Sequence, residues 1–265
     1  MALATPGTTV NPRWPVRVIA ALAVTPLLRR LVIADSVPSG CPRRTHCVRC
    51  GLPVSLTTPL RAVSPIGRCA GCNSRIGAPP MLLELALLAA VAVLASWFRS
   101  GPEASPANLP VVLETAAIGW WAVCAVPLAF VDLAVHRLPD RLTYAAVIGT
   151  WTLFGLAAIV DGDGTGWLRA VSAGIVIALL FAATTLLLGR RGFGLGDAKL
   201  ALSSAAILGW SGWGAVVLGL TAAFTTSAVG ALILLTARRV RWSDHLPFGP
   251  FLILGTLVAV AVVGR

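Results

Sequence analysis

The chain has 265 residues, of which 57% are hydrophobic and 12% charged, and its formal net charge is +11. Soluble domains carry roughly a quarter charged residues, so this composition excludes an ordinary soluble protein. The positive charge does not indicate nucleic-acid binding, because the basic residues stand in short segments between apolar stretches, as membrane orientation signals do. We therefore predict an all-α polytopic membrane protein embedded in a lipid bilayer.

Apolar stretches recur along the chain, and a helix needs about 20 mostly apolar residues to cross a bilayer. Pro26, Arg29 and Arg30 interrupt the first stretch, so residues 1–34 are either an uncleaved span, which we prefer, or a cleaved signal peptide. The expected organisation is an N-terminal transmembrane segment 1–34, a polar segment 35–79 and a transmembrane domain 80–265. The eight predicted spans are 16–34, 80–98, 109–131, 141–160, 168–188, 197–210, 213–236 and 247–264.

The basic residues give the predicted orientation. Passing the chain back and forth through the bilayer places 16 of the 21 basic residues in loops on one side, and Arg29 is counted with these loops although it also falls within the first predicted span, 16–34. The positive-inside rule assigns that side to the cytoplasm. The opposite side holds only Arg13, Arg17, Arg99, Arg169 and Arg265.

The polar segment contains two C-x2-C pairs, Cys47 with Cys50 and Cys69 with Cys72, separated by 18 residues. Each pair offers two thiolates on one turn, and this spacing is typical of a tetrahedral zinc site. Two disulfides are the alternative, which a reducing cytosol disfavours. Four thiolates leave no open coordination position, so the zinc would be structural. Alternative ligands nearby are Cys41 and His46.

Four of the ten acidic residues lie near cytoplasmic ends of predicted spans: Glu84, Asp132, Asp140 and Asp197. Asp132 ends the third span and Asp197 begins the sixth, so we expect both at the same membrane face and at comparable depth. Converging there, one carboxylate can activate water while the other, protonated, protonates a departing amine. The alternative is that each is an interfacial helix cap, for which Asp197 is well placed.

Glycines precede Asp197 in RRGFGLGD. Glycine can adopt positive φ, and it lets a backbone approach a ligand closely. Gly194 and Gly196, together with Gly192, are therefore candidate positions where an extended peptide could reach the carboxylates. The alternative is a plain flexible loop between helices.

Several motifs together resemble the type IV prepilin peptidase family of membrane aspartic proteases. GLGD at 194–197, continued by AKL, resembles the family's G-x-G-D signature, and Asp132 followed by LPD resembles its first aspartate element. The two C-x2-C pairs fall where family members carry a cytoplasmic zinc-binding segment. Two further elements that resemble the family are APPMLLELALL at 78–88 and HLPFGPFL at 245–252. The five motifs occur in the family's order between about residues 41 and 254.

The resemblance implies an aspartic endopeptidase of the inner (cytoplasmic) membrane that removes the basic leader from type IV prepilins or pseudopilins at the cytoplasmic face. It implies Asp132 and Asp197 as the catalytic pair, and Asp140 as a third carboxylate that shapes the turn or meets the leader. Many family members also methylate the new N-terminus with S-adenosylmethionine. The family's Gly-Ser-Phe-Leu-Asn stretch has no counterpart in LVIADSVPSGCP, so the resemblance supports proteolysis more fully than methylation.

Two other classes of protein stay open, a transporter and a non-catalytic scaffold. In each, zinc would stabilise the fold of the cytoplasmic segment. Transporters place polar binding groups near the bilayer midplane, whereas the carboxylates here gather at one face. A scaffold has no need for Asp132 and Asp197 together.

Overall fold

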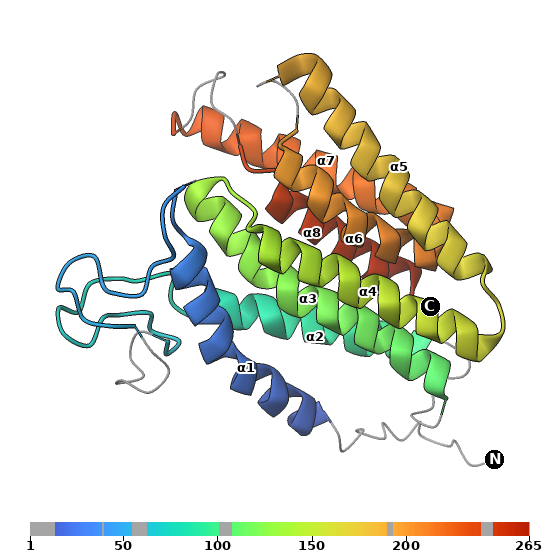
Figure 1. Cartoon of the computed structure of the whole chain (residues 1–265), viewed down its shortest axis with the longest axis horizontal. Coiled ribbons are helices and arrows are strands. Elements are labelled where there is room, and N and C mark those ends of the chain that lie inside the picture. The colour runs from blue at the N-terminus through green and yellow to red at the C-terminus, as the bar shows by residue number, and fades with distance from the viewer. Residues whose placement is uncertain are drawn as a thin grey trace, which may run out of the picture.

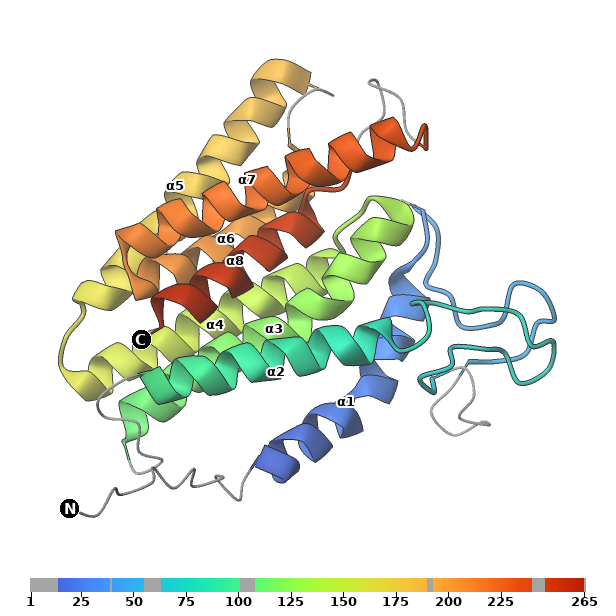
Figure 2. The same cartoon turned by 180° about the vertical axis from the view of Figure 1, so that it is seen from behind.

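The protein is described by a computed structural model covering residues 14–38, 40–54, 63–100, 108–189, 193–239 and 246–264. In this part of the chain the regular structure is entirely α-helical, apart from two isolated β-bridges in the polar segment (Figures 1 and 2). The helices are α1 (Trp14–Asp35), α2 (Leu82–Ser100), α3 (Leu109–Val135), α4 (Asp140–Asp161), α5 (Thr165–Leu188), α6 (Leu195–Ser211), α7 (Trp213–Thr236) and α8 (Gly249–Val263).

The predicted all-α membrane fold is confirmed, and the eight predicted spans correspond in order to these helices. Among the described residues, five helices are long and apolar enough to cross a membrane: α2, α3, α4, α5 and α7. The other three are weaker candidates, because α6 and α8 have only 17 and 15 residues and α1 contains the charged residues Arg17, Arg29, Arg30 and Asp35. The predicted number of eight crossings is therefore approximate.

The helices pack side by side in a bundle, and the polar segment projects from one end of it beside α1 (Figure 1). Helix α3 packs against α1, α2, α4 and α8, while α6 packs against α4, α5, α7 and α8. Helix α8 thus lies against both α3 and α6, the two helices that carry Asp132 and Asp197. This arrangement positions the candidate site.

Small residues allow the closest helix contacts, as is common where membrane helices pack. A Cβ on Gly174 of α5 would stand 2.7 Å from the carbonyl oxygen of Leu202 in α6. A Cβ on Gly209 of α6 would stand 2.7 Å from the Cβ of Ala173 in α5. Helices α5 and α6 can therefore approach to backbone contact, which fixes α6 firmly against its neighbour.

The structure corrects the placement of Arg29, which lies inside α1 rather than in a segment between spans. Its side chain is 1% exposed and makes a bidentate ion pair with Glu84 of α2, with N–O distances of 2.6 and 2.7 Å. The guanidinium also donates to the carbonyl oxygens of Pro65, Ala78 and Pro79 at 3.1 to 3.3 Å. Arg29 therefore joins α1, α2 and the polar segment in one buried cluster.

Candidate active site and metal centre

Asp132 lies in the last turn of α3, which continues to Val135 rather than ending at residue 131. The helix is closed by His136, whose left-handed backbone (φ 51°, ψ 46°) lets its N–H donate to the Asp132 carbonyl oxygen at 2.8 Å. The Asp132 side chain is 5% exposed. Its Oδ2 is buried and has no hydrogen-bond partner among the described residues, so it is available for a ligand or water.

Asp197 stands in the first turn of α6, as predicted for a helix cap. Its Oδ2 accepts a hydrogen bond from the N–H of Gly194 at 3.2 Å, and the N–H of Asp197 donates to the Gly194 carbonyl oxygen at 2.9 Å. This is half of a capping box, because Gly194 has no side chain to complete it. The side chain is 9% exposed, and capping occupies only one of its two oxygens.

The two carboxylates meet across Gly249, the first residue of α8. A Cβ on Gly249 would stand 2.7 Å from Oδ2 of Asp132 and 3.6 Å from Oδ1 of Asp197. These two oxygens are therefore separated by no more than the sum of those distances. The sequence placed both aspartates at one face, and the structure brings them together. Sequence reasoning did not include Gly249 as a site residue, although its motif HLPFGPFL was recognised.

Four phenylalanines pack together next to these helix ends: Phe181, Phe193, Phe224 and Phe248. Phe193, just before α6, has its ring centroid 4.5 Å from that of Phe181 and 4.9 Å from that of Phe248, just before α8. Aromatic pairs of this kind contribute about 0.5–1.5 kcal/mol each beyond their buried area. The cluster therefore fixes the starts of α6 and α8, and with them Asp197 and Gly249, relative to each other.

The glycines before Asp197 differ from their predicted conformation. Gly194 has φ −65° and ψ 148°, and Gly196 is not among the glycines with positive φ, so that expectation is wrong for both. Gly192 lies outside the described residues. A Cβ on Gly196 would stand 3.2 Å from the Cβ of Leu138, so its missing side chain lets α6 approach the turn between α3 and α4. The contacts of Gly194 and Gly196 are all within the protein, so a substrate-binding role for them stays a prediction.

Asp140 is separate from the buried pair. It begins α4, its side chain is 60% exposed, and its Oδ1 lies 2.7 Å from Nζ of Lys199 in α6. The Lys199 ammonium also lies 5.4 Å from the centre of the Tyr144 ring. Asp140 therefore balances the charge of Lys199 at the same end of the bundle as the buried aspartates.

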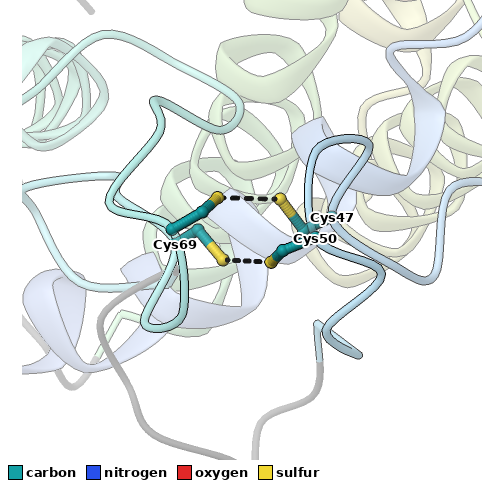
Figure 3. Close-up of side chains that lie close together, drawn as sticks. Cys47, Cys50 and Cys69 are labelled. Carbon is teal, nitrogen blue, oxygen red and sulfur yellow. Dashed lines mark hydrogen bonds between the residues drawn. The ribbon is translucent and has the colours of Figure 1, made fainter.

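The four cysteines of the C-x2-C pairs converge, as the sequence predicted (Figure 3). All four Sγ atoms lie within 4.8 Å of one another, with 3.7 Å between Cys47 and Cys72 and 3.5 Å between Cys50 and Cys69. Zinc–sulfur bonds of about 2.3 Å in a tetrahedron separate sulfurs by about 3.8 Å, so the cluster fits such an ion. The cysteines are free, and the alternative of two disulfides is not realised. The cluster can hold a metal ion.

The chemistry of these thiols also suits a cation. The N–H groups of Arg49 and Cys50 lower the pKa of Cys47 to about 6. The N–H of Leu52 lowers the pKa of Cys50, but the neighbouring Cys69 thiol and burial outweigh it and raise that pKa to about 12. Four thiols this close cannot all lose their protons in the absence of a cation, because the thiolate charges repel one another. A bound dication removes the conflict by stabilising every thiolate.

The fold and the buried carboxylates define an integral membrane protein with a candidate two-aspartate site at one end of its helical bundle. Comparison with known proteins identifies its family. The model of the type IV leader peptidase family matches residues 116–235, a range that includes both Asp132 and Asp197. No solved structure matches the chain significantly.

Similar proteins match over a longer stretch. A prepilin leader peptidase/N-methyltransferase of Aeromonas salmonicida (strain A449) is 31% identical over 227 residues, which cover 82% of this chain and 70% of the relative. A protein of the same name from Burkholderia pseudomallei (strain 1026b) is 34% identical over 234 residues, covering 83% and 69%. The chain belongs to the type IV leader peptidase family and is a peptidase.

Proposed function

We propose that this peptidase removes the basic leader from type IV prepilins or pseudopilins at the cytoplasmic face of the inner membrane, with Asp132 and Asp197 as its catalytic pair. The observation that carries the assignment is the meeting of two buried carboxylates, from distant parts of the chain, across Gly249. Family membership gives the reaction class, and the names of the relatives give the substrate class.

The geometry suggests which oxygens take part. Oδ2 of Asp197 already accepts the Gly194 N–H, whereas Oδ1 of Asp197 and Oδ2 of Asp132 both lie near Gly249. We assign these two oxygens to the water and the scissile peptide. One carboxylate takes a proton from water as the water attacks the peptide carbonyl, and the protonated partner gives its proton to the departing amine.

The surroundings of the pair suggest how a peptide could approach it. Gly194 has open space around its missing side chain apart from its own loop and Asp197, whereas Gly196 packs on Leu138. Gly194 is therefore the better of the two candidates for contact with an extended substrate. Asp140 offers an exposed carboxylate to the basic leader, which would compete with Lys199 for it.

Two cofactors belong to the proposal. We assign zinc to Cys47, Cys50, Cys69 and Cys72, where four thiolate ligands support a structural role. S-adenosylmethionine enters only through the methyltransferase part of the relatives' names. A methylation test adds labelled S-adenosylmethionine to freshly cleaved pilin. Label on the pilin supports this second activity, and unlabelled, fully cleaved pilin contradicts it.

The proteolytic proposal is tested by expressing the protein in membranes with a type IV prepilin and following leader removal. Wild type is expected to cleave, and Asp132→Asn and Asp197→Asn are each expected to lose cleavage almost completely, because an amide cannot exchange the proton. Asp161→Asn is the matched control, since Asp161 is exposed at the far end of α4 and should not matter. Normal cleavage by either site variant would refute the catalytic pair.

The transporter and scaffold alternatives are not favoured, because the chain belongs to a peptidase family. They also give no reason for two buried carboxylates to meet at one end of the bundle.

A further inference from the structure

A second site lies between the C-terminal half of α1 and the polar segment. A pocket of about 310 Å³ opens there, which we call the α1 pocket. It is separate from the aspartate pair and from the cysteine cluster, and none of the assignments above uses it. The lining residues that matter to its chemistry are Leu27, Arg30, Leu31, Arg43, Arg44 and Val54.

The α1 pocket carries an excess of positive charge. Arg43 is neutralised by Asp35, which accepts two hydrogen bonds from its guanidinium at 2.7 and 2.8 Å. Arg30 is exposed and Arg44 is half-buried, and neither has a carboxylate partner among the described residues. The pocket therefore presents three guanidinium groups against one carboxylate. Two guanidinium forks without partners form a suitable site for a phosphate group.

The same pocket has an apolar side. Leu27, Arg30, Leu31 and Ala34 follow the i, i+3, i+4, i+7 spacing and share one face of α1. Leu27 is 47% exposed and lies one turn farther than Leu31 from the end of α1 that meets the polar segment. The positive charge thus stands at the end of the helix, and the apolar surface extends from it toward the middle of the bundle.

We propose that the α1 pocket binds an anionic glycerophospholipid, with the phosphate between Arg30 and Arg44 and the start of an acyl chain along Leu27. Basic pockets beside membrane helices at the cytoplasmic side suit such head groups. A free phosphate would leave the apolar wall exposed, so the lipid is the better match. The inference rests on the proposed function in one respect only: the proposed function places this end of the bundle at the cytoplasmic face of the membrane.

Such a lipid has a structural consequence. It touches α1 through Arg30 and Leu27, and the polar segment through Arg44 and Val54. It therefore holds the metal-binding segment against the membrane surface, at the end of the bundle that carries the aspartate pair. Neither Asp132 nor Asp197 lines the α1 pocket, so lipid binding can be measured independently of cleavage.

The test is native mass spectrometry of the delipidated full-length protein titrated with phosphatidylglycerol or phosphatidylcholine. Wild type should bind one phosphatidylglycerol tightly and phosphatidylcholine more weakly. The double variant Arg30→Gln, Arg44→Gln should raise the dissociation constant for phosphatidylglycerol by on the order of tenfold or more. The matched control is Arg238→Gln, Arg239→Gln, which also removes two arginines, both exposed just after α7, and should leave binding unchanged.

Metal content per chain checks that each variant is folded. If the double variant loses its metal, Leu27→Ala replaces it, because this position is 47% exposed and the change removes apolar surface along which the acyl chain would lie, so phosphatidylglycerol should bind more weakly. Equal binding of the two lipids, equal loss in the control, or displacement by inorganic phosphate overturns the proposal. Normal phosphatidylglycerol binding by the Arg30→Gln, Arg44→Gln double variant, together with loss of its prepilin cleavage, also overturns the proposal, because it would assign the pocket to an acidic segment of the substrate.

Asp132→Asn separates this proposal from the proposed function. The variant should lose cleavage and bind phosphatidylglycerol as wild type does, because Asp132 is not part of the α1 pocket. Failure of wild type to cleave any prepilin would overturn the function and leave the lipid measurement valid.

Discussion

Gly249 is constrained by the carboxylates on either side of it rather than by its own backbone, since it is not among the glycines with positive φ. An added Cβ would stand 2.7 Å from Oδ2 of Asp132, closer than side chains normally approach. The atom in the way belongs to a short, buried side chain at the end of α3, so it has little room to move. Any residue larger than glycine must therefore displace the Asp132 carboxylate.

We accordingly predict that Gly249→Ala lowers the rate of prepilin cleavage by roughly a hundredfold, because small displacements of catalytic groups cost about that much. Cleavage in membranes, at equal protein level, is the measurement. Gly214→Ala in α7 serves as the control, because a Cβ there meets no atom within 4 Å. Wild-type cleavage by Gly249→Ala would show that the carboxylates do not act where the structure brings them together.

The candidate site was only partly accessible from the sequence. Asp132 and Asp197 were found because each is a charge beside a long apolar stretch, and topology alone put them at one face. Gly249 was not identified, because its importance is a distance to side chains on two other helices. The predicted positive φ was wrong for both Gly194 and Gly196. Close packing against Leu138 accounts for Gly196, whereas Gly194 is extended and has open space beside it apart from its own loop and Asp197.

Among the elements, α1 shows that a charged residue can be assigned to the wrong place when the assignment rests on its charge alone. Arg29 was assigned to a segment outside the membrane, whereas its partner Glu84 lies 55 residues away and buries it. Sequence spacing cannot reveal such a pair. The contacts of Arg29 with Pro65 and Ala78 also connect α1 to the metal-binding segment, so the pair supports two elements at once.

We predict that Arg29→Met destabilises the protein by on the order of 3 kcal/mol, because it leaves the Glu84 charge buried without a partner. Thermal unfolding in detergent should show a clearly lower midpoint. Lys199→Met is the control, since it breaks the exposed pair with Asp140 and should cost less than about 1 kcal/mol. Changing Glu84 to Leu as well should restore part of the loss. Equal midpoints for the two single variants would contradict a buried pair.

The metal-binding segment gives a second prediction at this scale. Purified protein should contain one zinc ion per chain, and Cys47→Ser or Cys69→Ser should lose it, because three thiolates close a tetrahedral site poorly. Elemental analysis of the purified variants measures this directly. Cys41→Ser, which changes an exposed cysteine outside the cluster, should retain the metal. Unchanged zinc in Cys47→Ser or Cys69→Ser would remove the assignment.

For the molecule as a whole, hydropathy predicted the order of the helices well but not how they pack. Membrane helices are apolar on most sides, so their sequence pattern does not identify the face that meets a neighbour. The position of α8 against both α3 and α6, on which the site depends, was therefore beyond sequence reasoning. The number of crossings stayed approximate for a related reason, because α1, α6 and α8 are short or interrupted.

The orientation of the whole bundle is the last prediction. Most basic residues gather at the end that carries the aspartate pair and the cysteine cluster, so this end should face the cytoplasm. An epitope inserted at Gly162, between α4 and α5, should be labelled in intact spheroplasts. The same epitope inserted at Arg238, after α7, should be labelled only after lysis. The reverse pattern would place Asp132 and Asp197 at the outer face, where the leader of an uninserted prepilin cannot reach them.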